Sequence, residues 1–142
     1  MILSKLWKAE TPAKSNLLMW LVLFECTPTW DRIQKKKLEG SGWCSLCHAA
    51  NESNHHLSVK CPFSKQLWKY VESSIGLVGL WNKHTMLENL SHWLDSVELK
   101  SLIHVPFLVL WRLWRARNEV IFVDNFVPSF QVAAQALSVL HC

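Results

Sequence analysis

Three cysteines and a histidine lie within 18 consecutive residues of this chain. Cys44 and Cys47 are separated by two residues, and His56 follows after eight more. Cys61 follows His56 after four more residues. Two thiolates in a tight turn, then an imidazole and a third thiolate, form the tetrahedral set typical of structural zinc, with bonds of about 2.3 Å to sulfur and about 2.0–2.1 Å to nitrogen. The spacing therefore predicts one structural Zn²⁺ held by these four residues, with no position left for water.

Two alternatives remain open at this cluster. His55 precedes His56 directly, and neighbouring residues of a helix point about 100° apart, so only one of the two imidazoles can face the metal. The other alternative has no metal at all: the cysteines are buried free thiols and the histidines lie on the surface. The number of ligands that the cluster offers favours zinc.

The run from Cys44 to His48 also fits C-x-x-C-H, the attachment motif of c-type haem, with His48 as an axial ligand. Haem attachment requires an export signal, and the sequence contains no clear one. It would also leave Cys61 without a role. Zinc accounts for more of the cluster than haem does.

The cysteine count and the net charge limit which cellular compartment and which binding partners are expected. The chain has 142 residues and five cysteines, an odd number that argues against a closed disulfide framework and favours a reducing, intracellular compartment. Its net charge of +4 permits contact with nucleic acid without requiring it. The apolar stretches 17–24 and 102–114 are shorter than the roughly 20 clean residues of a membrane span, so no membrane is expected.

The hydrophobic periodicity is mostly helical, so we expect a mainly α fold. The expected architecture is a small helical domain with one structural zinc knuckle, followed by a helical segment rich in tryptophan, of which the chain has nine. A split near residues 76–84 divides a zinc-bearing unit, 1–75, from a Trp-rich extension, 76–142. Expected helical segments are 14–25, 29–40, 52–60, 62–75, 85–97, 98–122 with a restart at Pro106, and 128–142.

Local signals set several of these boundaries. Pro62 suits the first position of a helix, and Gly76 suits its end. Thr85 and Glu88 form a capping box that opens the next helix. Residues 120–123 are a candidate strand. The expected buried positions of the two helices are Phe63, Leu67, Tyr70 and Val71 in the first and Leu87, Leu90, Leu94 and Val97 in the second.

The segments around the predicted ligands resemble a known family. They include residues 29–37 before the cysteine pair, Cys61-Pro62-Phe63 and Leu67-Trp68. They are similar to the zinc-binding domain found downstream of the polymerase in plant LINE-type (non-LTR) retrotransposon reverse transcriptases, over about residues 5–75. Residues 111–122 resemble the Trp-rich segment that often follows it. The resemblance implies Cys44, Cys47, His56 and Cys61 as the zinc ligands.

The chain departs from the family pattern at several positions. Glu52 and Ser53 stand where an acidic residue and a threonine are common, and Ser58 stands where an aromatic residue is usual. His55 replaces a common polar or acidic residue. The Pro-Pro-Lys entry to the domain is reduced to Pro-Ala-Lys at residues 12–14.

Catalysis is not expected. A polymerase needs paired carboxylates for two metal ions, and Asp31, Asp95 and Asp124 are isolated in the sequence. No catalytic residues and no small-molecule substrate are predicted. The chain then resembles a detached retroelement remnant, and a fragment without any function of its own is one alternative.

Basic residues near the cluster suggest a nucleic-acid partner, namely RNA or single-stranded DNA. Lys35, Lys36 and Lys37 precede the zinc turn, and Trp43 lies inside it, so phosphate contacts and base stacking are both available. Lys60, Lys65 and Lys69 can extend the same basic face. The alternatives are a solvated helix face and a zinc-stabilised protein-interaction module. The family resemblance suggests the nucleus as the compartment.

Overall fold

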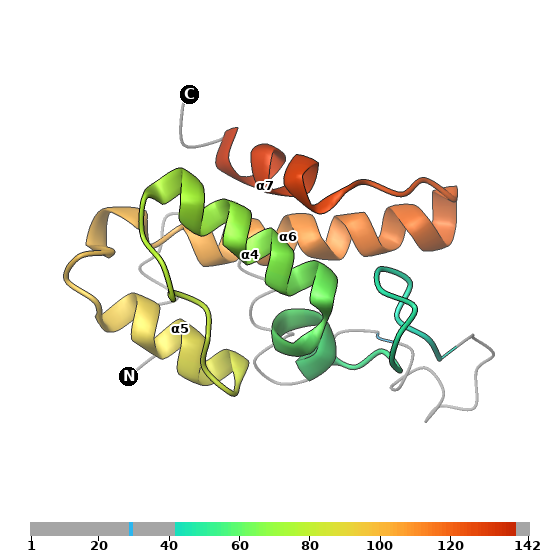
Figure 1. Ribbon diagram of the computed structural model, residues 1–142, viewed down its shortest axis with the longest axis horizontal. Coiled ribbons are helices and arrows are strands. Elements are labelled where there is room, and N and C mark those ends of the chain that lie inside the picture. Colours follow the sequence, from blue (N-terminus) through green and yellow to red (C-terminus); the bar gives the residue numbers. More distant parts are fainter. Residues whose placement is uncertain (1–28, 30–41, 139–142) are drawn as a thin grey trace.

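The structure, a computed structural model, describes residue 29 and residues 42–138. The expected helix over residues 14–25, almost all of the one over 29–40, and Lys35, Lys36 and Lys37 lie outside these residues. Within them the fold is mainly helical, as the periodicity predicts (Figure 1). None of the described helices is long and apolar enough to cross a membrane.

A turn-rich segment, residues 42–52, opens the described part, and we call it the zinc loop. It folds back on itself through an isolated antiparallel bridge between Trp43 and Asn51. A short π-helical turn, η1 (His56–Lys60), follows it. The helix α4 (Pro62–Ile75) then begins with proline at its first position and ends at Gly76, whose φ of 85° is the left-handed value that glycine adopts easily. Both predicted ends of this helix are confirmed.

The second half of the chain adds three helices and two short turns. Thr85 caps α5 (Met86–Asp95), and its hydroxyl oxygen accepts a hydrogen bond from the Glu88 amide at 3.1 Å. The 3₁₀ turn η2 (Lys100–Leu102) leads into α6 (Val105–Asn118), which has Pro106 in its first turn, so the helix restarts there as expected. A π turn, η3 (Glu119–Val123), and α7 (Ser129–Ser138) complete the fold.

The helix α7 returns along α6 and also packs on α4 (Figure 1). The chain reverses at Asp124, which has a left-handed φ of 54°. One continuous core runs through these elements and includes residues on both sides of position 76. Its largest fully buried side chains include Leu67, Leu90, Trp93, Phe107 and Val132. The domain boundary at residues 75/76 stays a prediction.

Tryptophans join the two sides of that position. The rings of Trp68, on α4, and Trp81 are stacked with centroids 4.2 Å apart and planes 9° apart, and Trp93 meets both at an angle. The indole N–H of Trp81 donates to the Ser58 carbonyl at 3.0 Å, and that of Trp93 donates to the Leu102 carbonyl at 2.9 Å. Their polar edges are thereby satisfied inside the core.

Three predicted buried positions are wrong. Tyr70 is exposed because the buried face of α4 is centred near Val71 and Trp68, which leaves Tyr70 at its rim. Leu87 is 50% exposed because α5 instead buries the face centred on Leu90. Val97 is 87% exposed because α5 ends before it, at Asp95. The candidate strand at 120–123 is also wrong, since these residues continue helical turns.

Candidate metal centre

The zinc loop supplies the first two predicted ligands from a tight turn. The Cys44 amide donates to the Ala50 carbonyl at 2.9 Å, and the His48 amide donates to the Cys44 carbonyl at 2.9 Å. The Glu52 amide closes the loop by donating to the Gly42 carbonyl at 2.9 Å. These bonds fix the backbone around both cysteines, so their sulfur atoms are held in place without a large local core.

The π turn η1 and the residue that directly follows it supply the other two ligands, His56 and Cys61. In an α-helix, with 3.6 residues per turn, side chains five residues apart point to different sides. The wider turn is closed by the Cys61 amide donating to the His56 carbonyl at 2.7 Å, and it brings these two side chains to the same side. The Ser53 hydroxyl accepts from the His56 amide at 3.0 Å and fixes the start of the turn. Sequence alone indicated a short helix here, but not its π geometry.

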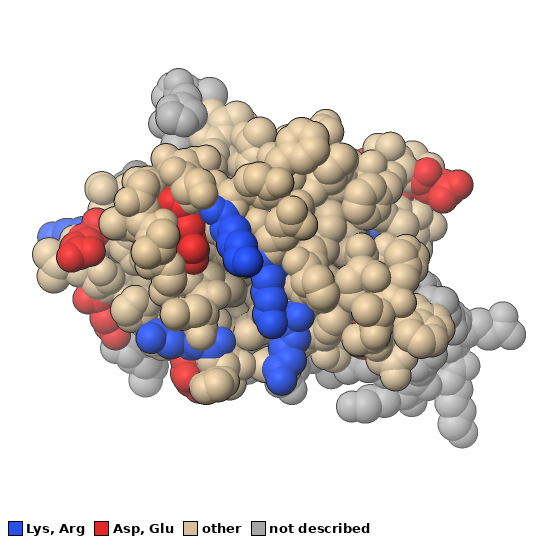
Figure 2. All heavy atoms as spheres, in the orientation of Figure 1, with Lys and Arg blue, Asp and Glu red and all other residues tan. Residues whose placement is uncertain are grey.

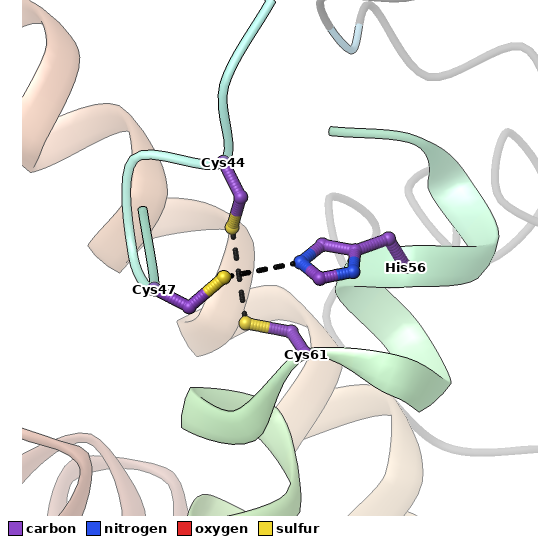
Figure 3. A group of neighbouring side chains, drawn as sticks. All are labelled: Cys44, Cys47, His56 and Cys61. Atoms are coloured by element: carbon purple, nitrogen blue, oxygen red, sulfur yellow. Dashed lines mark hydrogen bonds between the residues drawn. The ribbon is translucent and has the colours of Figure 1, made fainter. Parts of the chain in front are cut away.

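The four predicted ligands converge on one point (Figure 3). All of their potential ligand atoms lie within 4.8 Å of one another. The Sγ atoms of Cys44 and Cys61 are 3.8 Å apart, and the Cys47 Sγ is 3.3 Å from the His56 Nε2. A tetrahedral zinc ion with bonds of standard length places two sulfurs about 3.8 Å apart and a sulfur and a nitrogen about 3.6 Å apart. The donor set and its spacing therefore fit one Zn²⁺.

The spacing also separates this centre from a disulfide, whose sulfur atoms lie about 2.05 Å apart. All three described cysteines are free. His48, the candidate haem ligand, is exposed at a left-handed turn with φ 56° and lies outside the ligand group. Exposed His55 is outside the group as well, so the structure selects His56 from the two neighbouring imidazoles.

The contact between the two buried thiols shifts their pKa values in opposite directions. The hydrogen bond to Cys61, together with burial, raises the pKa of the Cys44 thiol far above its usual range. The same hydrogen bond lowers the pKa of the Cys61 thiol, and the amides of Ser64 and Phe63 at the start of α4 act in the same direction. Cys61 is therefore the more acidic thiol of the pair. A bound metal cation would stabilise both sulfurs as thiolates.

The imidazole of His56 is also prepared for a metal. Burial lowers its pKa, although the nearby Glu52 carboxylate opposes the shift. The lowered pKa keeps the ring neutral to lower pH than in a solvated histidine, and neutral imidazole is the form that binds zinc. With four protein ligands the coordination of zinc is complete, so such an ion stabilises the fold and has no open position for a substrate.

An ion pair behind the loop was not predicted. The carboxylate of Glu52 binds the guanidinium of Arg117 through two contacts, Nη2 to Oε1 at 2.7 Å and Nε to Oε2 at 3.0 Å, and both side chains are buried. Arg117 also donates to the Asn118 side-chain oxygen at 2.9 Å and lies 4.6 Å above the Trp114 ring. The pair joins the zinc loop to α6. Two features of the sequence could have indicated this ion pair: a carboxylate four residues before the ligand histidine, and an arginine in an apolar helix.

His56→Ala is expected to lower zinc content from one ion per chain to well below one, because it removes the nitrogen ligand. The matched control His55→Ala changes the neighbouring exposed ring and should retain a full equivalent of zinc. Elemental analysis of both variants, purified under reducing conditions, gives the comparison. Loss of zinc in His55→Ala with retention in His56→Ala would reverse the assignment.

Comparison with known families supports the same centre. Residues 1–68, just under half of the chain, match the family described as zinc-binding in reverse transcriptase. That stretch contains all four predicted ligands. No curated protein and no solved structure matches the chain significantly. The match concerns a zinc-binding domain of reverse transcriptase and does not extend to a catalytic domain.

Proposed function

We propose that this chain is a non-catalytic accessory module, derived from a retroelement reverse transcriptase, that binds RNA or single-stranded DNA. One zinc ion stabilises the surface that makes the contact. Two observations support the origin and the metal: the family match over residues 1–68 and the converging Cys₃His group. The finer origin, in plant LINE-type elements, and a nuclear location rest on the resemblance of the sequence.

A row of exposed lysines carries the nucleic-acid part of the proposal. Lys60 directly precedes the ligand Cys61, and Lys65 and Lys69 follow on α4, four residues apart and therefore on one face. Figure 2 shows basic side chains gathered in a diagonal row over this part of the molecule. We call Lys60, Lys65 and Lys69 the lysine row. Such a row beside a zinc centre suits contacts to successive phosphates.

Trp43 complements the row with an aromatic surface. It lies next to the ligand Cys44 in the zinc loop and is 53% exposed. An exposed indole held by a rigid loop suits stacking with an unpaired base. Lys35, Lys36 and Lys37 precede this loop in the sequence and are expected to add phosphate contacts.

The test measures how zinc-loaded full-length protein binds fluorescent single-stranded RNA and DNA. Fluorescence anisotropy gives the affinity at each of a series of salt concentrations. The proposal expects the logarithm of the affinity to fall linearly with the logarithm of the salt concentration. The same affinity at low and high salt would contradict it. No binding even at low salt would overturn it in favour of a protein-interaction module or a fragment without function.

Trp43→Ala is expected to weaken binding by roughly 5- to 150-fold, because stacking of one base on an aromatic ring contributes about 1–3 kcal/mol. Salt dependence should be unchanged, since no charge is removed. Phe122→Ala is the matched control: this ring is 75% exposed and lies on η3, outside the zinc loop. Equal affinities of the two variants in the anisotropy titration would remove Trp43 from the proposed surface.

A further inference from the structure

A groove of 580 Å³ lies between α4 and the segment that joins it to α5. The volume is within the range, about 300–1,000 Å³, of sites that enclose a small organic molecule. One wall carries the lysine row, and the other carries Gly79, Asn82, Lys83 and His84. The groove therefore has basic residues on both sides, from segments that the sequence suggested were separate units.

The wall opposite α4 is held in place by hydrogen bonds. The Glu72 carboxylate accepts from the backbone amides of Gly79, Leu80 and Trp81 at 3.3, 2.9 and 3.3 Å. Further along, the side chain of the fully buried Asn89 accepts from the Lys83 amide at 2.8 Å.

Asn89 also donates to the carbonyls of Lys83 and Thr85, at 3.4 and 2.9 Å. The segment is thus fixed at two points, one from α4 and one from α5. The Lys83 backbone is consequently positioned opposite the lysine row before any ligand arrives, which reduces the entropy lost on binding.

The charge in the groove is predominantly positive. Four lysines, Lys60, Lys65, Lys69 and Lys83, line it together with a single carboxylate, Glu72. That carboxylate already accepts three backbone hydrogen bonds and does not pair with a lysine within the described residues. Lysines on both walls of a groove attract an anion more strongly than the same charges spread over a flat surface.

The inner surface of the groove is better suited to contact phosphate groups than to recognise bases. Trp68 and Trp81 both line it, but they are stacked on each other and buried. Their ring faces are therefore not available for stacking with a base. Most of the polar groups that remain for recognition are lysine ammonium groups, which suit a phosphodiester chain of any sequence.

We propose that this groove binds the phosphate backbone of a single strand, with the lysine row contacting one side of the strand and Lys83 the other. The inference rests on the proposed function and specifies where the strand lies. It also extends the binding surface further beyond the residues that match the reverse-transcriptase family, since Lys83 lies outside residues 1–68, as Lys69 already does. The groove has the volume of a site for a small organic molecule rather than for two paired strands, so a single strand is the expected ligand.

The test removes one charge from each wall. Each phosphate contact with a single strand contributes about 0.7 to the slope of log affinity against log salt concentration. Lys65→Gln/Lys83→Gln is therefore expected to reduce the slope by about 1.4, which corresponds to about 25-fold weaker binding at 0.1 M salt. The control Lys100→Gln/Arg115→Gln removes the same net charge from exposed residues outside the groove and should keep the wild-type slope.

The measurement is anisotropy with a uridine oligonucleotide of about ten nucleotides and zinc-loaded protein, checked for native helicity by circular dichroism. A wild type that binds with strong salt dependence while Lys65→Gln/Lys83→Gln keeps its slope would overturn the groove and leave the proposed function standing. The groove would also be overturned if the control pair reduced the slope as much as the groove pair does. A duplex bound as tightly as the single strand would likewise overturn the groove. A wild type that binds no strand overturns both proposals.

Discussion

Cys47→Ser is expected to abolish stoichiometric zinc binding and to disorder the zinc loop. Structural zinc contributes about 10–16 kcal/mol of apparent binding free energy in small zinc-finger peptides, and that free energy becomes folding free energy. Besides its backbone hydrogen bonds and the Glu52–Arg117 pair, the zinc loop would be joined to His56 and Cys61 by the metal, so it depends on the ion. Cys47 is only half-buried, which keeps the loss of packing small. The effect of the substitution therefore reports on the metal.

Elemental analysis and circular dichroism of reduced protein measure this effect. Wild type should carry one zinc per chain, and Cys47→Ser should carry almost none and show less helical signal. Ser45→Ala, in the same turn, is the control and should keep both zinc and helicity. A wild type that is well folded without zinc would contradict the metal centre. A haem spectrum would instead direct attention to His48.

Arg117→Met is expected to lower the free energy of unfolding by about 3–5 kcal/mol, because it leaves the buried Glu52 carboxylate without its guanidinium partner. Methionine keeps much of the length and apolar contact of the arginine stem. Small proteins are stable by only about 5–15 kcal/mol, so the loss is a large share of the total. Urea unfolding of the zinc-loaded wild type and variant measures the change in the free energy of unfolding.

Two further variants show whether the pair itself causes the loss. Arg115→Met, two residues earlier on α6 and exposed, should change stability by less than about 0.5 kcal/mol. Glu52→Leu/Arg117→Met removes both charges and should be less destabilised than the sum of the two single changes, because neither charge is left buried alone. Additive losses would indicate that the two side chains act independently.

The sequence predicted those parts of the structure that depend on neighbouring residues. The start of α4 at Pro62, its end at Gly76 and the Thr85 cap of α5 are confirmed, since each rests on the conformational preference of one residue or on a contact within one turn. The grouping of the four potential ligands was likewise predicted, because ligand spacing within a short segment restricts the geometry that the chain can adopt.

Features that depend on contacts between distant segments were harder to predict from the sequence. The pairing of Glu52 with Arg117 joins residues 65 positions apart, and no local pattern specifies such a partner. The buried face of α5 was misjudged because Asn89, a polar residue, lies in it with its side chain bonded to the preceding segment. The π geometry of η1 was missed because residues 56–60 carry no distinctive signal for a wider turn.

The stacked pair of Trp68 and Trp81 has a consequence for where the folded unit ends. Trp68 is the last residue of the stretch that matches the reverse-transcriptase family, and its stacking partner lies beyond that stretch. A replacement of either ring would leave a void beside the other, so the packing of both segments depends on the pair. The packed unit is accordingly longer than the stretch that matches the family, because the core of the later helices is continuous with that of the zinc-bearing half.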